Sequence, residues 1–128
     1  MQINVCTAKI HRATVTQADL NYVGSITIDS DILTAAGILP FQMVQITNCA
    51  NGTLWRTYAM SGEPRSGVIC LNGPPARHFQ PGDQIIVLAE AQVDLKEFAG
   101  LVPKVVFVDG KNKVIRVEQH QPSGFADK

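Results

Sequence analysis

The sequence is short of charge, of aromatic side chains and of long apolar runs. Charged residues make up 17% and aromatic residues 6% of its 128 residues. The 11 basic and 11 acidic residues give a net charge of zero. This balance argues against a nucleic-acid or anionic-membrane partner, because both require a basic surface. So few charges cannot cover the surface of a small protein, so we expect part of it to lie in a subunit interface.

The longest apolar runs, residues 85–89 and 105–108, are far shorter than the roughly 20 residues that span a membrane. The N-terminus also lacks a signal-peptide pattern, so we expect a cytoplasmic protein without a membrane partner. The three cysteines are odd in number, and neither they nor the three histidines have the spacing of metal ligands. We therefore expect free thiols in a reducing compartment and no metal site.

The residues that are abundant favour strands over helices. Val, Ile and Thr supply 32 residues, a quarter of the chain. Asn51-Gly52 predicts a tight hairpin turn, and a short helix is expected after Asp29-Ser30-Asp31, ending at Gly37. Further short helices are expected from Asn72-Gly73-Pro74-Pro75 and around residues 94–99. The expected strands are residues 3–16, 21–28, 43–47, 53–60, 68–71, 84–89, 104–108 and 114–118.

Many short strands with a few one- or two-turn helices predict a small, mainly β barrel. The length fits one domain, which we place at residues 1–118. Residues 119–128 form a polar stretch with a proline and a glycine, and we expect a flexible tail there.

Several side chains group on strand faces at a spacing of two. Lys9 and His11 share a face of the first strand, and Leu54, Arg56 and Tyr58 share a face of the strand after the hairpin. Taken alone, such residues are more often a solvated or subunit-edge surface than a catalytic site. A tyrosine at a strand end is more often a packed ring with a wet hydroxyl than a proton donor.

Gly24-Ser25 interrupts a strand-like stretch and carries little information by itself. A structural interpretation is a bulge at Gly24, with the Ser25 hydroxyl bonded to a local backbone group.

In context, the sequence resembles the pyruvoyl-dependent L-aspartate 1-decarboxylases. The matching segments are K-I-H-R-A-T-V-T, Y-V-G-S-I-T-I-D, A-A-G-I-L, N-G, T-Y and N-G-P-P-A-R. They follow the order and spacing of the family from about residue 9 to residue 108. The resemblance implies a double-psi β-barrel, a homotetramer with active sites between subunits, and a small amino acid as substrate.

The resemblance also implies that the chain is a proenzyme. It is expected to cleave itself between Gly24 and Ser25 into a β chain of residues 1–24 and an α chain of residues 25–128. Ser25 becomes a pyruvoyl cofactor, which binds the substrate amine as a Schiff base. Without a Cβ, Gly24 is expected to adopt a strained backbone that exposes its carbonyl. Thr57 is expected to stabilise the resulting oxyanion and to contact substrate.

The same resemblance assigns Tyr58 as the proton donor. It also implies a set of residues that bind the substrate or position the chain end beside it. They are Lys9, His11, Tyr22, Asn72 and Gly73, and the hypothesis given next adds Arg56 to this set.

The sequence departs from the family at two places. Leu54 stands where the family has an arginine that binds a substrate carboxylate. Our hypothesis is that Arg56, roughly 7 Å along the same strand face, replaces it together with Lys9. The alternative is a different substrate. Pro74-Pro75 replaces small residues, which removes two backbone N–H donors.

Three functions are consistent with the sequence. The first is conversion of L-aspartate to β-alanine and CO2 for pantothenate and coenzyme A synthesis. The second is the same pyruvoyl chemistry on a β-substituted aspartate or another small amino acid. The third is an uncleaved double-psi barrel that acts as a binding or assembly module. Whether processing requires a maturation factor is left open.

Overall fold

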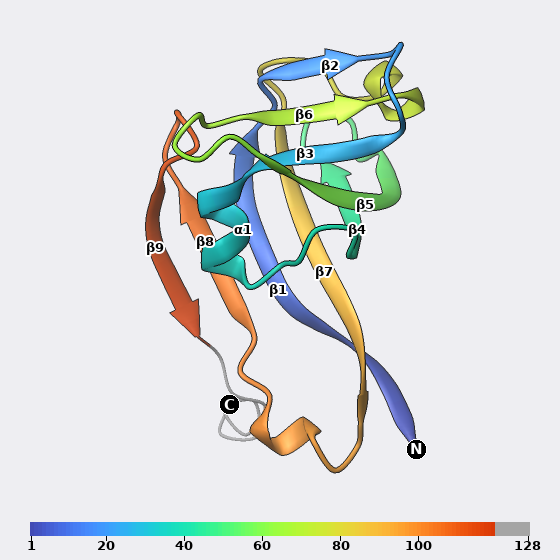
Figure 1. Cartoon of the computed structure of the whole chain (residues 1–128), viewed down its shortest axis with the longest axis vertical. Coiled ribbons are helices and arrows are strands. Elements are labelled where there is room, and N and C mark those ends of the chain that lie inside the picture. The colour runs from blue at the N-terminus through green and yellow to red at the C-terminus, as the bar shows by residue number, and fades with distance from the viewer. Residues whose placement is uncertain (120–128) are drawn as a thin grey trace.

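The computed structural model describes residues 1–119, and within them the chain is mainly β (Figure 1). Nine strands form one mixed sheet in the order β2-β6-β3-β5-β4-β7-β1-β8-β9. One α-helix and two 3-10 helices complete the described part. The strands are β1 (Gln2–Thr14), β2 (Gln17–Asp19), β3 (Ser25–Asp29), β4 (Met43–Asn48), β5 (Leu54–Gly62), β6 (Ile69–Asn72), β7 (Gln84–Asp94), β8 (Lys104–Val108) and β9 (Val114–Gln119). The helices are α1 (Ser30–Ala36), η1 (Pro74–Arg77) and η2 (Phe98–Gly100).

The core consists of every second side chain along the strands, because successive side chains of a strand point to opposite faces of the sheet. Ala8 and Ile10 of β1 are buried, and β7 and β4 add Val87 and Ile46 to the same cluster. Nearly all these side chains are aliphatic, and many are β-branched, which explains why so few aromatic residues suffice. Strand β1 pairs with β7 in antiparallel and with β8 in parallel orientation, so it connects the β8–β9 hairpin to the rest of the sheet.

Helix α1 begins and ends where the sequence predicts. The Asp29 carboxylate accepts a hydrogen bond of 2.8 Å from the Asp31 amide, and Gly37 takes the left-handed conformation, with φ 73°. The buried Asp29 side chain also accepts bonds from the Gly67 amide at 2.7 Å and the Arg65 amide at 3.2 Å. One carboxylate therefore fixes both the helix N-terminus and the loop between β5 and β6.

Asn112 makes a second clamp, in the turn between β8 and β9. Its side-chain amide accepts a bond from the Thr14 amide and donates to the carbonyl oxygens of Thr14 and Gly67, each at 2.8 Å. Asn112 is 1% exposed. The β8–β9 hairpin is thereby tied to the end of β1 and to the β5–β6 loop.

Most of the predicted elements are confirmed, including the hairpin at Asn51-Gly52, the short helix after Asn72 and the strands at 43–47, 84–89 and 104–108. Three predictions were wrong in part. Residues 21–24 form a turn rather than a strand, because the chain must reverse between β2 and β3. The strand expected at 3–16 ends at Thr14, and the helix expected at 94–99 is only the short 3-10 turn η2.

Gln119, expected in the tail, is the last residue of β9, and residues 120–128 lie outside the described part. No helix within residues 1–119 is both long and apolar enough to span a membrane.

Candidate active site around Ser25

Ser25 is the first residue of β3 and is almost fully buried, at 3% exposure. It lies directly opposite Asn72, the last residue of the antiparallel neighbour β6. The Asn72 side-chain amide donates a 3.1 Å hydrogen bond to Ser25 Oγ. The Ser25 hydroxyl in turn donates to the Val23 carbonyl oxygen at 3.4 Å. This hydrogen bond joins the residues on either side of Gly24. The structure therefore brings together Ser25 and Asn72, two of the predicted site residues.

Asn72 is the centre of a larger buried polar group. Its Nδ2 also donates to Thr27 Oγ1 at 3.0 Å, and its Oδ1 accepts a bond from Cys70 Sγ at 3.1 Å. Thr27 pairs with Cys70 as Ser25 pairs with Asn72, so the four side chains share one face of the β3–β6 pair. The intervening residue Ile26 points the other way, into the core. This group, Ser25, Thr27, Cys70 and Asn72, is called the Asn72 cluster below.

The backbone at Gly24 is not strained, so that expectation was wrong. Its φ lies outside the left-handed region, and a Cβ built there would come no closer than 3.8 Å to any atom, the nearest being Cδ of Pro74. The crowded glycine is instead Gly73, which has φ 78°. A Cβ on Gly73 would lie 2.8 Å from Gly24 Cα and 3.1 Å from the Tyr22 carbonyl oxygen. Gly73 is therefore the residue that lets the two chain segments approach each other.

Pro74 and Pro75 begin the 3-10 helix η1 immediately after Gly73. The first N–H groups of a helix have no intrahelical partner, so prolines there break no helix bond. The Gly73 amide that precedes them is used, since it donates a 2.8 Å bond to the Asp19 carbonyl oxygen. The two prolines thus fit the local structure beside Gly24.

Thr57 and Tyr58 lie on β5, which runs parallel to β3 with Ile26 opposite Ala59. Continuing this register by one residue sets Tyr58 beside Ser25, on the face away from the core. Thr57 is buried on the opposite, core-facing side of β5. The Tyr58 ring stacks on that of Phe41, with centroids 5.7 Å apart. The sheet thus brings Tyr58 to the face that carries the Asn72 cluster.

Lys9 and His11 share a face of β1, as predicted. Ala8 and Ile10, which alternate with them along the strand, are buried on the opposite face. The His11 ring packs against Phe107, with centroids 5.3 Å apart. Partial burial lowers the pKa of His11, and the nearby charges of Lys9 and Arg12 lower it further. In the sheet order, four steps separate β1 from β3, which carries Ser25.

Arg56 is not close to Lys9 within one chain. A row of paired residues connects them through Gln45 of β4 and Leu88 of β7, so three strand spacings, about 14 Å along the sheet, lie between them. Arg56 Nη1 instead contacts Glu90 Oε2 at 2.6 Å.

Two further residues discussed in the sequence analysis are exposed. Leu54, which replaces the arginine of the family, is 56% exposed and lies on the same face of β5 as Arg56. Tyr22, which the resemblance assigned to the site, is 64% exposed and lies in the turn before Gly24.

Sequence reasoning missed Thr27 and Cys70, which complete the Asn72 cluster. The sequence predicted no more for Cys70 than a free thiol. Residues 25 and 27 are two apart, as are residues 70 and 72, so each pair lies on one face of its strand. That these two faces coincide can be known only from the register of β3 and β6. Within residues 1–119 no group of three His, Cys, Asp or Glu side chains is arranged to hold a metal ion.

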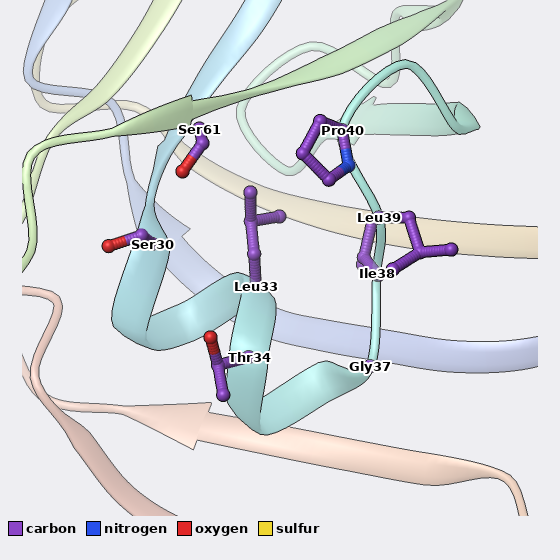
Figure 2. Close-up of a pocket in the computed structure, with 8 residues that line it drawn as sticks. All are labelled: Ser30, Leu33, Thr34, Gly37, Ile38, Leu39, Pro40 and Ser61. Atoms are coloured by element: carbon purple, nitrogen blue, oxygen red, sulfur yellow. The ribbon is translucent and has the colours of Figure 1, made fainter.

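A cavity of ≈ 420 Å³ lies elsewhere, between α1, the loop after this helix and β5 (Figure 2). In Figure 2 the Leu33 side chain points from the helix toward the space between Ser61 and Pro40. The lining residues are Ser30, Leu33, Thr34, Gly37, Ile38, Leu39, Pro40 and Ser61. They include no ionisable side chain and none of the predicted site residues, so this cavity is not the candidate active site.

The sequence is similar to known proteins over nearly its whole length. The family model described as aspartate decarboxylase matches residues 1–115. The chain is 54% identical over 114 residues to an aspartate 1-decarboxylase of Neisseria meningitidis, covering 89% of this chain and 90% of the relative. It is 49% identical over 121 residues to that of Caldicellulosiruptor saccharolyticus, covering 94% of each, and 55% identical over 107 residues to that of Exiguobacterium sibiricum, covering 84% of each. The chain therefore belongs to the aspartate decarboxylase family.

Proposed function

We propose that this chain is a carboxy-lyase that converts L-aspartate to β-alanine and CO2 after cleaving itself between Gly24 and Ser25. The observation that carries the proposal is the identity of 49–55% to aspartate 1-decarboxylases over nearly the whole chain. The buried Ser25, whose hydroxyl accepts a hydrogen bond from Asn72, supports the cleavage site. The product β-alanine would serve pantothenate and coenzyme A synthesis in the cytoplasm.

Cleavage requires that Ser25 Oγ attack the carbonyl carbon of Gly24. The new C–O bond replaces the peptide C–N bond, and the hydroxyl proton ends on the freed amine of residue 25. Loss of the Ser25 α-proton then breaks the Cβ–O bond and releases residues 1–24 with a carboxylate at Gly24. The dehydroalanine left at residue 25 adds water and loses ammonia, which leaves a pyruvoyl group.

The chain's own residues fit these steps. The Asn72 amide holds Oγ beside the bond to be attacked, because orientation of the nucleophile is a large part of such a reaction. Thr57 is buried on β5, the parallel neighbour of β3, and we assign its hydroxyl to the developing oxyanion. Burial of Ser25 keeps bulk water from the ester.

The surroundings of residue 25 would also fit a pyruvoyl group, since the site is buried and the polar Asn72 amide lies beside the residue 25 side chain. The pyruvoyl group supplies a ketone that captures the substrate amine and accepts the electron pair left when CO2 departs. Tyr58, on the same face of the sheet, is assigned to return a proton to the substrate carbon.

We infer that a second copy of the chain completes the site, in a homotetramer. Four steps along the sheet separate Lys9 and His11 from Ser25, so they reach a pyruvoyl group only from a neighbouring subunit. Large apolar side chains are exposed near Tyr58, including Phe41 at 69% and Met43 at 46%. Such residues on a weakly charged surface favour burial between subunits. Tyr22 and Gly73, beside the cleaved bond, are assigned to the substrate side of the same site.

Family membership further implies the double-psi β-barrel as the finer description of this mixed sheet. The parallel pairings β3–β5 and β1–β8, next to antiparallel ones, support that inference.

Intact-mass spectrometry of the purified chain tests the proposal directly. We expect the full-length chain to be replaced by two species, residues 1–24 and residues 25–128 with a pyruvoyl group in place of Ser25. A Ser25→Ala variant provides the matched uncleaved control. A single full-length species that persists after prolonged incubation would contradict self-cleavage and would favour the uncleaved binding module.

Substrate identity is a separate question, because Leu54 replaces the carboxylate-binding arginine and Arg56 is paired with Glu90. Borohydride treatment of the cleaved protein with candidate amino acids should add mass to residues 25–128 only when a substrate or close analogue is captured. Capture of L-aspartate with release of β-alanine supports the proposed reaction. Capture of another small amino acid, without turnover of aspartate, would favour the alternative substrate.

A further inference from the structure

We propose that Cys70 is a positioning residue for self-cleavage, whose thiol orients the Asn72 amide so that both of its N–H donors face β3. This inference rests on the proposed function and names a further residue on which the processing step depends. Cys70 does not touch the scissile bond. It acts through Asn72, which touches Ser25.

Both N–H donors and the oxygen of the Asn72 amide have hydrogen-bond partners. The amide has two N–H donors, and these go to Ser25 Oγ at 3.1 Å and Thr27 Oγ1 at 3.0 Å. Its oxygen therefore has to accept, and the thiol of Cys70 is the donor at 3.1 Å. No buried side-chain nitrogen or oxygen within residues 1–119 lacks a hydrogen-bond partner, so the network is closed.

The hydroxyl of Ser25 determines which way the amide must point. Ser25 has one hydrogen, and it is directed at the Val23 carbonyl oxygen, 3.4 Å away. Its oxygen is then an acceptor toward Asn72, so the NH2 end of the amide must face Ser25. An amide flipped by 180° would turn its oxygen toward two hydroxyls and its N–H donors toward sulfur, a weak acceptor. The thiol therefore favours the orientation that binds Ser25.

The thiol stays protonated, which a donor must be. Burial raises the pKa of Cys70, and the nearby Asp19 carboxylate raises it further. At neutral pH the group is an S–H donor.

The consequence for chemistry is the position of Ser25 Oγ. A serine side chain can rotate among three staggered positions, and only one of them is bonded to Asn72. An Asn72 amide that is free to flip holds Oγ in that position for less of the time. Loss of the Cys70 donor should therefore slow the acyl shift rather than abolish it.

The test measures the cleavage rate of freshly refolded chains by intact mass. Cys70→Val keeps an apolar side chain but removes the donor, and we expect cleavage about three- to tenfold slower, the effect of one modest hydrogen bond. Cys70→Ser keeps a donor and should restore a rate within about twofold of the original chain. Cys49→Val, at an exposed cysteine, is the matched control and should not change the rate.

A double variant separates positioning from packing. If Cys70 acts through Asn72, adding Cys70→Val to an Asn72→Ala chain should cause no further slowing. A further slowing of the same size in that background would overturn the proposal, because it would assign the effect to packing. Thermal unfolding of each variant checks folding, and Thr27→Val, which frees the other Asn72 donor, tests the same network if Cys70→Val does not fold.

The outcomes also distinguish this inference from the proposed function. An original chain that stays at full length would overturn both. An original chain that is cleaved, with Cys70→Val cleaved equally fast, would overturn only the role of Cys70.

Discussion

If the chain cleaves itself as proposed, Gly73→Ala should slow the cleavage strongly although residue 73 is not at the proposed cleavage position. Gly73 has φ 78° and ψ −147°, a region that is essentially restricted to glycine. The new Cβ would also lie 2.8 Å from Gly24 Cα and 3.1 Å from Gly24 N. Ordinary van der Waals contact begins at 3.4 Å, so the Gly24 backbone has to retreat by the difference between 3.4 and 2.8 Å, about 0.6 Å. Both effects act at the bond that Ser25 attacks in the proposed reaction.

The expected size follows from these two terms. The backbone conformation alone costs about 1–3 kcal/mol, which should appear as a lower free energy of unfolding. A displacement that approaches 1 Å at the reacting atoms can slow a reaction by about 100-fold, so we expect cleavage to be slowed by at least about tenfold. Cleavage is followed by intact mass, and stability by urea unfolding in a Ser25→Ala background, where no chain is cleaved.

Gly82→Ala is the matched control. Gly82 also has a left-handed backbone, with φ 93°, but a Cβ there would meet no atom within 4 Å. It should lose stability for the same conformational reason and still cleave at the original rate. Normal cleavage of Gly73→Ala would refute the argument, since the close approach to Gly24 would then be unimportant. Gly24→Ala, with its nearest atom at 3.8 Å, should fold normally.

Three further predictions concern other contacts. Asn112→Ala removes three hydrogen bonds of 2.8 Å and leaves their backbone partners unpaired, so urea unfolding should show a loss of about 2–4 kcal/mol; an unchanged midpoint would contradict the clamp. If Arg56 binds the substrate carboxylate, Glu90→Gln should release Arg56 from its ion pair and lower the KM for aspartate, and Arg56→Ala should raise this KM. Equal KM values in the original chain and both variants would exclude that role. Lys9→Met should raise the pKa of His11 toward its ordinary value in an NMR titration, because burial first and the charge of Lys9 next hold it down; an unchanged pKa would show that the Lys9 charge has no effect.

Elements governed by neighbouring residues were predictable from the sequence. Asp29 caps α1, Gly37 ends it with φ 73°, and Asn51-Gly52 forms the hairpin turn between β4 and β5. Each of these signals acts within a few residues along the chain, so no knowledge of the tertiary structure is needed.

The turn before β3 was not predictable in the same way. Tyr22 and Val23 are strand-forming residues next to β3, but the chain reverses there to bring β2 and β3 to opposite sides of β6. That reversal depends on Gly73, some fifty residues later in the chain, which closely approaches the Gly24 backbone. A contact between such distant residues leaves no local pattern in the sequence.

The residues of the candidate site also differ in whether the sequence alone could predict them. Ser25, Gly24 and Asn72 were predicted because the family motif contains them, whereas Cys70 and Thr27 entered only through strand register. The strain assigned to Gly24 was wrong for a related reason: the glycine required at the cleavage site belongs to the facing segment.

These observations explain why one serine among several is suited to the acyl shift. Within residues 1–119, Ser25 is the only serine that is buried. Ser66 is exposed, and its hydroxyl is occupied by the Glu63 carbonyl oxygen and the Val68 amide. Ser25 is instead held by the side chain of Asn72 in a buried site, with Gly73 close to Gly24, the residue that it attacks in the proposed reaction. Reactivity at this position therefore comes from the tertiary packing of β6 against β3, and variants of β6 should affect cleavage more than variants of Gly24.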